Sequence, residues 1–312
     1  MPPMMKAVHI YEYGSPSVLT FEDAACPSPG PGEALIRVEA TSVNPFDCAM
    51  RAGYLQSYFQ LPMPYIPGVD LAGVVAEVGE GVTEFQPGDS VFARGGIVRD
   101  GANAQYAVTP VADMARKPAT LDALHAAALP HVALTAWQAR FELAQLGQGQ
   151  TVLIHGAGGG VGHVATQLAK SRGATVIGTT SRNRDLVGGL ADTVIDYMET
   201  PFEQEVHDVD VVLDTIGGDT QDRSWQVIRP GGILVSLIQQ PSADTAASHG
   251  VRQAMVYSAP PIGPTLVEVA RLVDAGQLRV EVSEVLPLAE IRRAHEMVEA
   301  RHTRGKIVLQ VH

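Results

Sequence analysis

The sequence predicts an α/β protein that combines a mostly antiparallel β domain with a doubly wound parallel-sheet domain. Before about residue 118, strand-like runs with period-two alternation, such as ALIRVEATSV, are separated by Pro- and Gly-rich turns. Between residues 151 and 240, short apolar runs alternate with helix-like segments, which is typical of a parallel sheet covered on both faces. A chain of 312 residues, 46% of them hydrophobic, can bury two such cores.

The elements follow one another in a regular order. The first domain begins with the strand KAVHI and continues with ALIRVEATSV, GVDLAGVVAEVG and DSVFA. From about Leu121 the apolar spacing becomes helical and predicts two helices broken at Pro130. The alternating region then predicts strands at TVLIHG, ATVIGTT, TVIDY, VDVVLDT and GGILVSLI, with helices over residues 162–172, 185–190 and 221–228.

The C-terminal segment is expected to return to the first domain. After residues 259–261 the chain has two helix-like stretches, TLVEVARLVDAG and AEIRRAHEMVEARH, and a final strand, KIVLQV. About fifty residues make a poor independent core, so these elements need a partner. The predicted domains are therefore residues 1–119, completed by 260–312, and residues 120–259.

Composition and charge exclude several classes of protein. Acidic residues outnumber basic ones by 34 to 22, and the basic residues are scattered, so no nucleic-acid partner is expected. Cys26 and Cys48 are too few for a disulfide framework or a structural zinc site. No apolar run is long enough to span a membrane, and the N-terminus lacks the pattern of a signal peptide. A soluble cytoplasmic protein is the expectation.

The segment TVLIHGAGGGVG predicts a nucleotide-binding turn. Five of the seven residues from Gly156 to Gly162 are glycine, and the run lies between an apolar strand and a helix. Free N–H groups at a helix N-terminus bind a pyrophosphate, and glycine lets phosphate oxygens approach the backbone. On the usual GxGxxG pattern, an alanine takes the first glycine position. The predicted cofactor-binding turn comprises Ala157, Gly158, Gly159, Gly160, Val161 and Gly162.

The end of the next strand indicates which dinucleotide binds. An NAD site has Asp or Glu there, which accepts a hydrogen bond from the ribose 2′-hydroxyl. Here the strand ends in Thr180, Ser181 and Arg182, and the first carboxylate is Asp185. Hydroxyls and a guanidinium suit a 2′-phosphate, so NADPH is the predicted cofactor. The alternative is that Arg182 is a solvated surface arginine.

With these motifs, the sequence resembles the medium-chain dehydrogenase/reductase superfamily, in its zinc-free branch of zeta-crystallin-like quinone oxidoreductases and enone reductases. The resemblance covers essentially the whole chain and implies a GroES-like β domain, completed by the C-terminal segment, around a Rossmann domain. The motifs that carry it are TSVNPFDCAMRAGYL, PYIPGVDLAGVVAEVGEGVTEFQPGDSVFA, AALPHVALTAWQA, VLIHGAGGGVGHVATQLAKSRGATVIGT, VDVVLDTIGG, RPGGILVSL and RGKIVLQV.

The same resemblance implies a site without metal. Zinc-dependent relatives have ligands at the positions of Asn44, Val69 and His131, and only His131 is a potential ligand here. The four cysteines of a structural zinc lobe are also missing from VFARGGIVRDGANAQYAV. Alcohol oxidation without a Lewis acid needs another way to stabilise an alkoxide, whereas a quinone or α,β-unsaturated carbonyl readily accepts hydride from NADPH.

The resemblance also implies roles for individual residues. Asn44 is expected beside the nicotinamide and the substrate, as a catalytic and cofactor-binding residue. Tyr54 is the candidate proton donor or carbonyl orienter, and the alternative is that it packs in its loop. The other expected cofactor contacts are Thr135, Thr180, Ser181, Arg182, Tyr197, Thr215, Ile216, Gly217, Leu237, Ile238 and Lys306.

Three further side chains have mainly structural interpretations. Asp47 and Arg51 are four residues apart on a predicted helical turn and could form an ion pair. His131 is expected to be a hydrogen-bonded residue of the substrate cleft. Cys48 is expected to be a small buried residue.

The leading hypothesis is an NADPH-dependent oxidoreductase that transfers hydride to a quinone or an α,β-unsaturated carbonyl. A protein of another class, which binds NADPH as a structural or redox-sensing partner, is the alternative. An alcohol dehydrogenase is a more distant one. The sequence does not name the acceptor.

A homodimer is expected through the segment from Val251 to Ser258, VRQAMVYS. It is strand-like and stands where the family pattern has the edge strand of the cofactor-domain sheet. Met255 and Val256 give this edge an apolar character with little protecting charge, which favours pairing with a second copy. The alternative is that a helix or loop of the same chain covers the edge. Proline at Val256 is expected to weaken the dimer.

Overall fold

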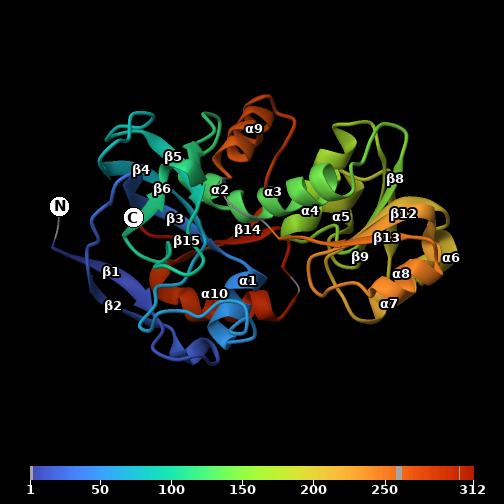
Figure 1. Ribbon diagram of the computed structural model, residues 1–312, viewed down its shortest axis with the longest axis horizontal. Coiled ribbons are helices and arrows are strands. Elements are labelled where there is room, and N and C mark those ends of the chain that lie inside the picture. The colour runs from blue at the N-terminus through green and yellow to red at the C-terminus, as the bar shows by residue number, and fades with distance from the viewer. Residues whose placement is uncertain (1–2, 258–261, 302) are drawn as a thin grey trace. The chain divides into compact units, whose positions relative to one another are not determined.

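The computed structural model describes residues 3–257, 262–301 and 303–312 (Figure 1). The chain divides into two compact units. Unit 1 comprises Met1–His131, Ala259–Gly276 and Val280–His312, and unit 2 comprises Val132–Ser258 and Gln277–Arg279. One unit contains a largely antiparallel sheet and the other a parallel sheet, so the predicted α/β fold class is confirmed.

Unit 1 is built on a seven-stranded sheet in the order β14-β15-β3-β4-β5-β7, with β6 also paired to β3. The C-terminal strand β15 pairs antiparallel with β3, with Ile307 opposite Val43, so Lys306 lies near the end of β3. The strands are β3 (Glu33–Val43), β4 (Asp70–Val78), β5 (Ser90–Arg94), β6 (Tyr106–Pro110), β7 (Met114–Arg116), β14 (Val282–Pro287) and β15 (Lys306–Gln310), with β1 (Met4–His9) and β2 (Thr20–Ala25) as a separate antiparallel pair.

Unit 2 is built on a six-stranded parallel sheet in the order β10-β9-β8-β11-β12-β13. From β8 the chain proceeds outward to β10, then returns to the other side of β8 and proceeds from β11 to β13. Ligands of doubly wound sheets bind at the carboxyl ends of the strands where the order reverses, which is here between β8 and β11. The strands are β8 (Thr151–Ile154), β9 (Thr175–Thr180), β10 (Thr193–Asp196), β11 (Val209–Asp214), β12 (Ile228–Ser236) and β13 (Arg252–Met255).

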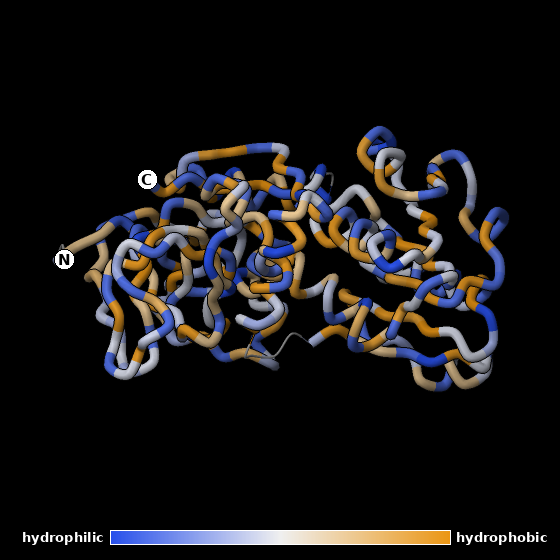
Figure 2. Tube along the Cα trace, turned by 90° about the horizontal axis from the view of Figure 1, so that it is seen from above, coloured by the Kyte–Doolittle hydropathy of each residue, from blue (hydrophilic) through white to orange (hydrophobic). Residues whose placement is uncertain are grey.

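Helices connect and cover these strands. They are α1 (Pro45–Ala52), α2 (Ala123–Ala127), α3 (Pro130–Trp137), α4 (Gly160–Lys170), α5 (Arg184–Gly188), α6 (Phe202–Glu205), α7 (Asp219–Ser224), α8 (Ala243–Ser248), α9 (Gly263–Asp274) and α10 (Ile291–Glu299). Each unit has its own apolar core, with Ile36, Leu71 and Val91 in unit 1 and Leu153, Val212 and Leu234 in unit 2. Figure 2 shows hydrophobic stretches along the chain inside both units and hydrophilic residues at many of the turns.

Some boundaries differ from those that the sequence predicts. Helix α4 begins at Gly160, two residues before the predicted start, because Gly159 is its N-cap and the glycine turn runs directly into the helix. Residues Gln138–Leu143 form a π-helix after α3. Strand β14 is absent from the sequence prediction, because its alternating side chains are mostly half-buried or exposed and the pattern is weak.

Candidate functional site

The glycine turn after β8 adopts a tight backbone that favours glycine. Gly156 has φ +65°, in the left-handed region. A Cβ at Gly162 would lie 2.2 Å from the carbonyl oxygen of Gly156 and 2.8 Å from the Cα of Ala157, so no larger residue fits without moving the turn. The helix α4 starts directly at this turn, with its first N–H groups unpaired within the helix. These features leave a compact helix N-terminus whose free N–H groups suit an anion.

Two other strand-end loops of unit 2 adjoin this turn, and a third adjoins the loop after β11. A Cβ at Gly156 would lie 2.6 Å from Thr215 Oγ1, which places the loop after β11 against the turn. A Cβ at Gly158 would lie 2.6 Å from the Cβ of Asn183, in the loop after β9. A Cβ at Gly217 would lie 3.0 Å from Ile238 Cγ2, in the loop after β12. The predicted cofactor residues at the ends of four strands are therefore brought together.

Asp214 organises the loop after β11, and sequence reasoning missed it. Its carboxylate is fully buried and accepts hydrogen bonds from the backbone N–H groups of Ile216 at 3.0 Å and Gly217 at 2.8 Å. It also accepts from Gln221 Nε2 at 2.9 Å and from Ser236 Oγ at 3.0 Å. The sequence feature that could have indicated this role is the carboxylate at the end of VVLD, immediately before TIGG.

Strand β9 is followed by two exposed arginines, Arg182 and Arg184, of which Arg184 is ion-paired. Arg184 Nε donates to Asp196 Oδ2 at 2.8 Å, and its guanidinium also lies 2.6 Å from Glu199. Arg182 is exposed, and within the described part of the chain no ion pair engages it. Ser181 Oγ donates to the Tyr197 hydroxyl at 2.9 Å, so these two predicted contacts are adjacent. Hydroxyl and guanidinium groups at this position can donate hydrogen bonds to a phosphate.

Unit 2 therefore fits a dinucleotide. The glycine turn offers backbone N–H groups to a pyrophosphate, and the loop after β9 offers hydroxyls and a guanidinium at the neighbouring position. Thr135, another predicted contact, is buried in α3 of the same unit. Leu237 donates its backbone N–H to the Asp214 carbonyl oxygen at 3.0 Å, which fixes the start of the loop after β12.

Unit 1 contains a buried polar cluster formed by Ser42, Asn44, Asp47, Asp70 and Lys306. Asp70 is fully buried and accepts from Ser42 Oγ at 2.6 Å and from Asn44 Nδ2 at 2.8 Å. Asp47 Oδ2 accepts from the backbone N–H of Asn44 at 2.8 Å and from Asn44 Nδ2 at 3.1 Å. The Lys306 ammonium donates to Asn44 Oδ1. The cluster joins the end of β3, α1, the start of β4 and the start of β15.

Burial shifts the pKa values of this cluster. Burial, followed by the nearby Asp70 carboxylate, raises the pKa of Asp47 to about 6. Burial lowers the pKa of Lys306, although Asp70 and Asp47 oppose the change. His131 donates its backbone N–H to Asp70 Oδ1 at 2.7 Å, and burial lowers the pKa of its ring to about 4, so the imidazole is neutral at pH 7.

The expected pairing of Asp47 with Arg51 is wrong. The Asp47 carboxylate faces Asn44 at the start of α1, whereas Arg51 pairs with Glu299 of α10. Residues four apart on a helix pair with each other only if neither side chain finds a better partner, and here both do. Cys48 is buried as expected, with Sγ 3.4 Å from His295 Nδ1, and burial strongly raises the pKa of its thiol. Tyr54 is 80% exposed in the loop that follows α1.

The residues at the zinc-ligand positions of the resemblance do not fit a zinc ion. The Asn44 amide is engaged by Lys306, Asp47 and Asp70, and Val69 has a buried apolar side chain. Among the described residues, no group of three or more His, Cys, Asp or Glu side chains is arranged to hold a metal ion. A catalytic zinc needs three protein ligands, and this set supplies one imidazole at most.

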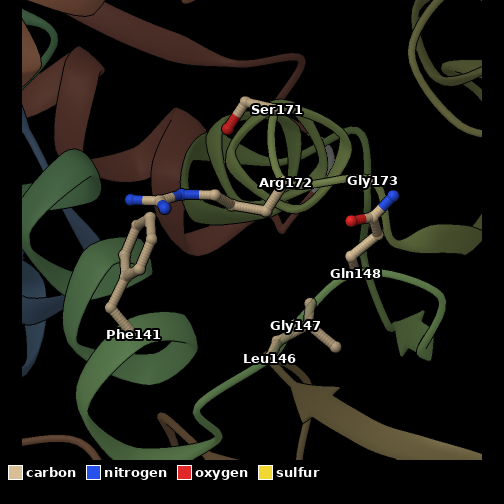
Figure 3. A pocket seen from close by; sticks show the side chains of 7 residues that line it. All are labelled: Phe141, Leu146, Gly147, Gln148, Ser171, Arg172 and Gly173. Atoms are coloured by element: carbon tan, nitrogen blue, oxygen red, sulfur yellow. The ribbon is translucent and has the colours of Figure 1, made fainter.

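A hollow of about 560 Å³ in unit 2 lies away from the glycine turn (Figure 3). It is lined by Phe141, Leu146, Gly147, Gln148, Ser171, Arg172 and Gly173. Residues 146–148 precede β8 and residues 171–173 precede β9, so the hollow is at the amino ends of these parallel strands. It is therefore not the dinucleotide site, which needs the carboxyl ends.

Two parts of the chain match known families. Residues 30–119 match the alcohol dehydrogenase GroES-like domain, and residues 190–309 match the zinc-binding dehydrogenase family. The chain is 33% identical to the mitochondrial NAD(P)H oxidoreductase RTN4IP1 of Danio rerio, over 99% of this chain and 92% of that protein. It is 29% identical to the quinone oxidoreductase of Pongo abelii, over 98% of both chains.

Solved structures agree with this result. The quinone oxidoreductase from Coxiella burnetii superposes with a TM-score of 0.90 at 34% identity, covering 99% of this chain and 100% of that one. A mycobacterial protein solved in complex with NADPH has a TM-score of 0.89 at 30% identity, covering 98% of this chain and 100% of that one. No helix within the described residues is long and apolar enough to cross a membrane.

Proposed function

Because the chain belongs to the medium-chain dehydrogenase/reductase superfamily, in its quinone oxidoreductase-like branch, it is an oxidoreductase, and we propose that it reduces quinones or α,β-unsaturated carbonyls with NADPH and without zinc. The observation that carries the proposal is the assembly in unit 2 of the glycine turn with three neighbouring strand-end loops. Bound NADPH supplies a hydride to an electron-poor carbon of the acceptor, and water or a side chain supplies the proton.

The chain's own residues have distinct tasks in this proposal. The N–H groups of the glycine turn bind the pyrophosphate, and Arg182 with Ser181 binds the 2′-phosphate. Asn44 and Tyr54 stay the proposed reactive-site residues of unit 1. The imidazole of His131 is neutral, and its ring contacts the ring of Phe46 at 5.5 Å between centroids. Together the two rings form a weakly polar surface that suits a flat conjugated acceptor.

Replacing Arg182 by alanine is expected to narrow the preference for NADPH over NADH by about tenfold or more, because a charge-assisted hydrogen bond contributes roughly 1.5–3 kcal/mol. Titrations of both nucleotides measure the two dissociation constants. Arg172→Ala is the matched control, since it removes the same charge from the amino-end side of the sheet and should leave the ratio unchanged. Equal affinities for NADPH and NADH in the unmodified protein would contradict the assignment.

We also propose that the protein is a homodimer through β13. This strand is at the edge of the parallel sheet, over the described residues Arg252–Met255, while Ser258 of the expected segment lies outside the described residues. An edge strand has unpaired N–H and C=O groups that a second copy can satisfy. The N–H of Val256 already donates to Ser236 of β12 at 3.0 Å, so it does not face the open edge. The N–H groups of successive residues in a strand point to opposite sides, so the N–H of Met255 points to the open edge of the sheet.

Met255→Pro is therefore the informative change, in place of proline at Val256. It removes an outward N–H group and should shift the protein from dimer to monomer, whereas Met255→Ala keeps that group and should stay dimeric. Light scattering at micromolar concentration measures the mass. A single-chain mass for the unmodified protein would refute the proposed dimer.

The second candidate function is NADPH binding without turnover, and the observation that favours it is the burial of the Asn44 side chain. Such a protein would bind NADPH and consume none of it with any acceptor.

The cytoplasm stays the predicted compartment, although the relative named above from Danio rerio is mitochondrial.

A further inference from the structure

Lys306 lies buried at the start of β15, with its ammonium surrounded by oxygen atoms of unit 1. It donates to Asn44 Oδ1, to the carbonyl oxygen of Val43 at 3.3 Å and to Asp70 Oδ2 at 3.4 Å. An ammonium has three donors and no acceptor, so these oxygens use its full hydrogen-bonding capacity. The side chain is 3% exposed, and it has no donor left for a nucleotide.

This environment fixes the side-chain amide of Asn44 in one of its two orientations. The amide oxygen faces the ammonium, which can only donate, and the NH₂ group faces the carboxylates of Asp70 at 2.8 Å and Asp47 at 3.1 Å. Half a turn about the Cβ–Cγ bond would place the NH₂ group against the ammonium and the oxygen against the carboxylates. Every hydrogen bond would then become a repulsive contact.

Asp70 holds Lys306 in place. Its carboxylate accepts from Ser42 Oγ at 2.6 Å and from the backbone N–H of His131 at 2.7 Å, so its position does not depend on the lysine. A buried anion with fixed neighbours provides a defined site for the buried cation. Asp70 therefore positions Lys306, and Lys306 in turn positions the Asn44 amide.

We propose that Lys306 is a positioning residue, which orients the Asn44 amide and does not contact the cofactor. This inference rests on the proposed function, in which Asn44 belongs to the reactive site. It replaces the cofactor contact that the resemblance implies for Lys306. Lys306→Met retains the length and removes the donors, so the Asn44 oxygen loses its partner and the amide is held through its NH₂ group alone.

The first test needs neither activity nor nucleotide. NMR measures hydrogen exchange of the Asn44 side-chain NH₂ group, whose resonances are identified by their absence in Asn44→Ala. Both protons should exchange slowly in the unmodified protein and about tenfold or more faster in Lys306→Met, because a charge-assisted contact is lost. Unchanged exchange in Lys306→Met would overturn the proposal.

A matched control separates orientation from general destabilisation. Thr41 lies beside the cluster, and its hydroxyl donates to the Asp70 carbonyl oxygen at 2.6 Å without touching Asn44. Thr41→Val should therefore destabilise unit 1 and leave the Asn44 exchange within about twofold of the original rate. The double variant Lys306→Met with Asp70→Asn removes the buried ion pair between these two residues, so it provides a folded alternative and should show the same fast exchange.

Kinetics then separate positioning from cofactor binding. Lys306→Met should lower kcat about tenfold or more and leave the Kd for NADPH within about twofold. In an Asn44→Ala background, the same change should alter kcat by less than about twofold, because it acts through Asn44. A weakened Kd with unchanged kcat would restore the cofactor contact and overturn the proposal. Failure of the proposed function would instead appear as no NADPH oxidation by the unmodified protein, with the exchange result intact.

Discussion

Gly162→Ala is expected to reduce the affinity for NADPH by about a hundredfold or more, because the added Cβ would lie 2.2 Å from the Gly156 carbonyl oxygen. Neither atom can move alone, since the Cβ is bonded to the Gly162 backbone and the oxygen belongs to the backbone of the same tight turn. The turn must open, and its N–H groups then no longer converge on the pyrophosphate. Calorimetric titration of NADPH measures the loss.

Gly188→Ala is the matched control for this prediction. Gly188 ends α5 in the same unit, and a Cβ there would meet no heavy atom within 4 Å. The same chemical change should therefore leave NADPH affinity unaltered and slightly stabilise the helix. An unchanged affinity in Gly162→Ala would mean that the turn does not hold the cofactor.

Asp70→Ala is expected to lower the free energy of unfolding of unit 1 by about 3–5 kcal/mol, because it leaves the buried Lys306 ammonium without its anion. It also removes the acceptor for Ser42, Asn44 and the His131 N–H. Both tryptophans, Trp137 and Trp225, belong to unit 2. Urea unfolding followed by circular dichroism should show the loss, while tryptophan fluorescence follows unit 2.

Asp23→Ala provides the comparison with an exposed pair. Asp23 lies 2.9 Å from Lys6, and their side chains are 63% and 47% exposed. Water and salt screen this contact, so its loss should cost less than about 1 kcal/mol. Equal losses of unfolding free energy in Asp70→Ala and Asp23→Ala would show that the buried polar cluster does not stabilise unit 1 more than an exposed ion pair does.

The parallel-sheet unit could be predicted from sequence because its determinants are local. The apolar strands, the glycine turn and the helix after it are contiguous, and the position of Arg182 follows from where β9 ends. Parallel strands bring their carboxyl ends to one edge of the sheet, so Ser181, Thr215 and Leu237, which the sequence and the resemblance assign to the cofactor, lie at that edge.

The polar cluster of unit 1 could not be predicted in the same way. Its members come from positions 42 to 306 of the chain, and only strand pairing across β3, β4 and β15 brings them together. Helical spacing favours a pairing of Arg51 with Asp47, but Glu299 competes from a distant helix. The family pattern alone assigns Lys306 to the cofactor, because a lysine in a sequence motif gives no indication of its burial.

NADPH oxidation by the purified, chelator-dialysed protein, followed spectroscopically with a panel of quinones and α,β-unsaturated carbonyls, tests the proposed function most directly. We expect turnover with at least one acceptor class, faster with NADPH than with NADH, unchanged by the chelator and strongly reduced in Gly162→Ala at an NADPH concentration below saturation. Bound NADPH with no turnover by any acceptor, or turnover that zinc removal abolishes and zinc addition restores, would contradict the proposed function.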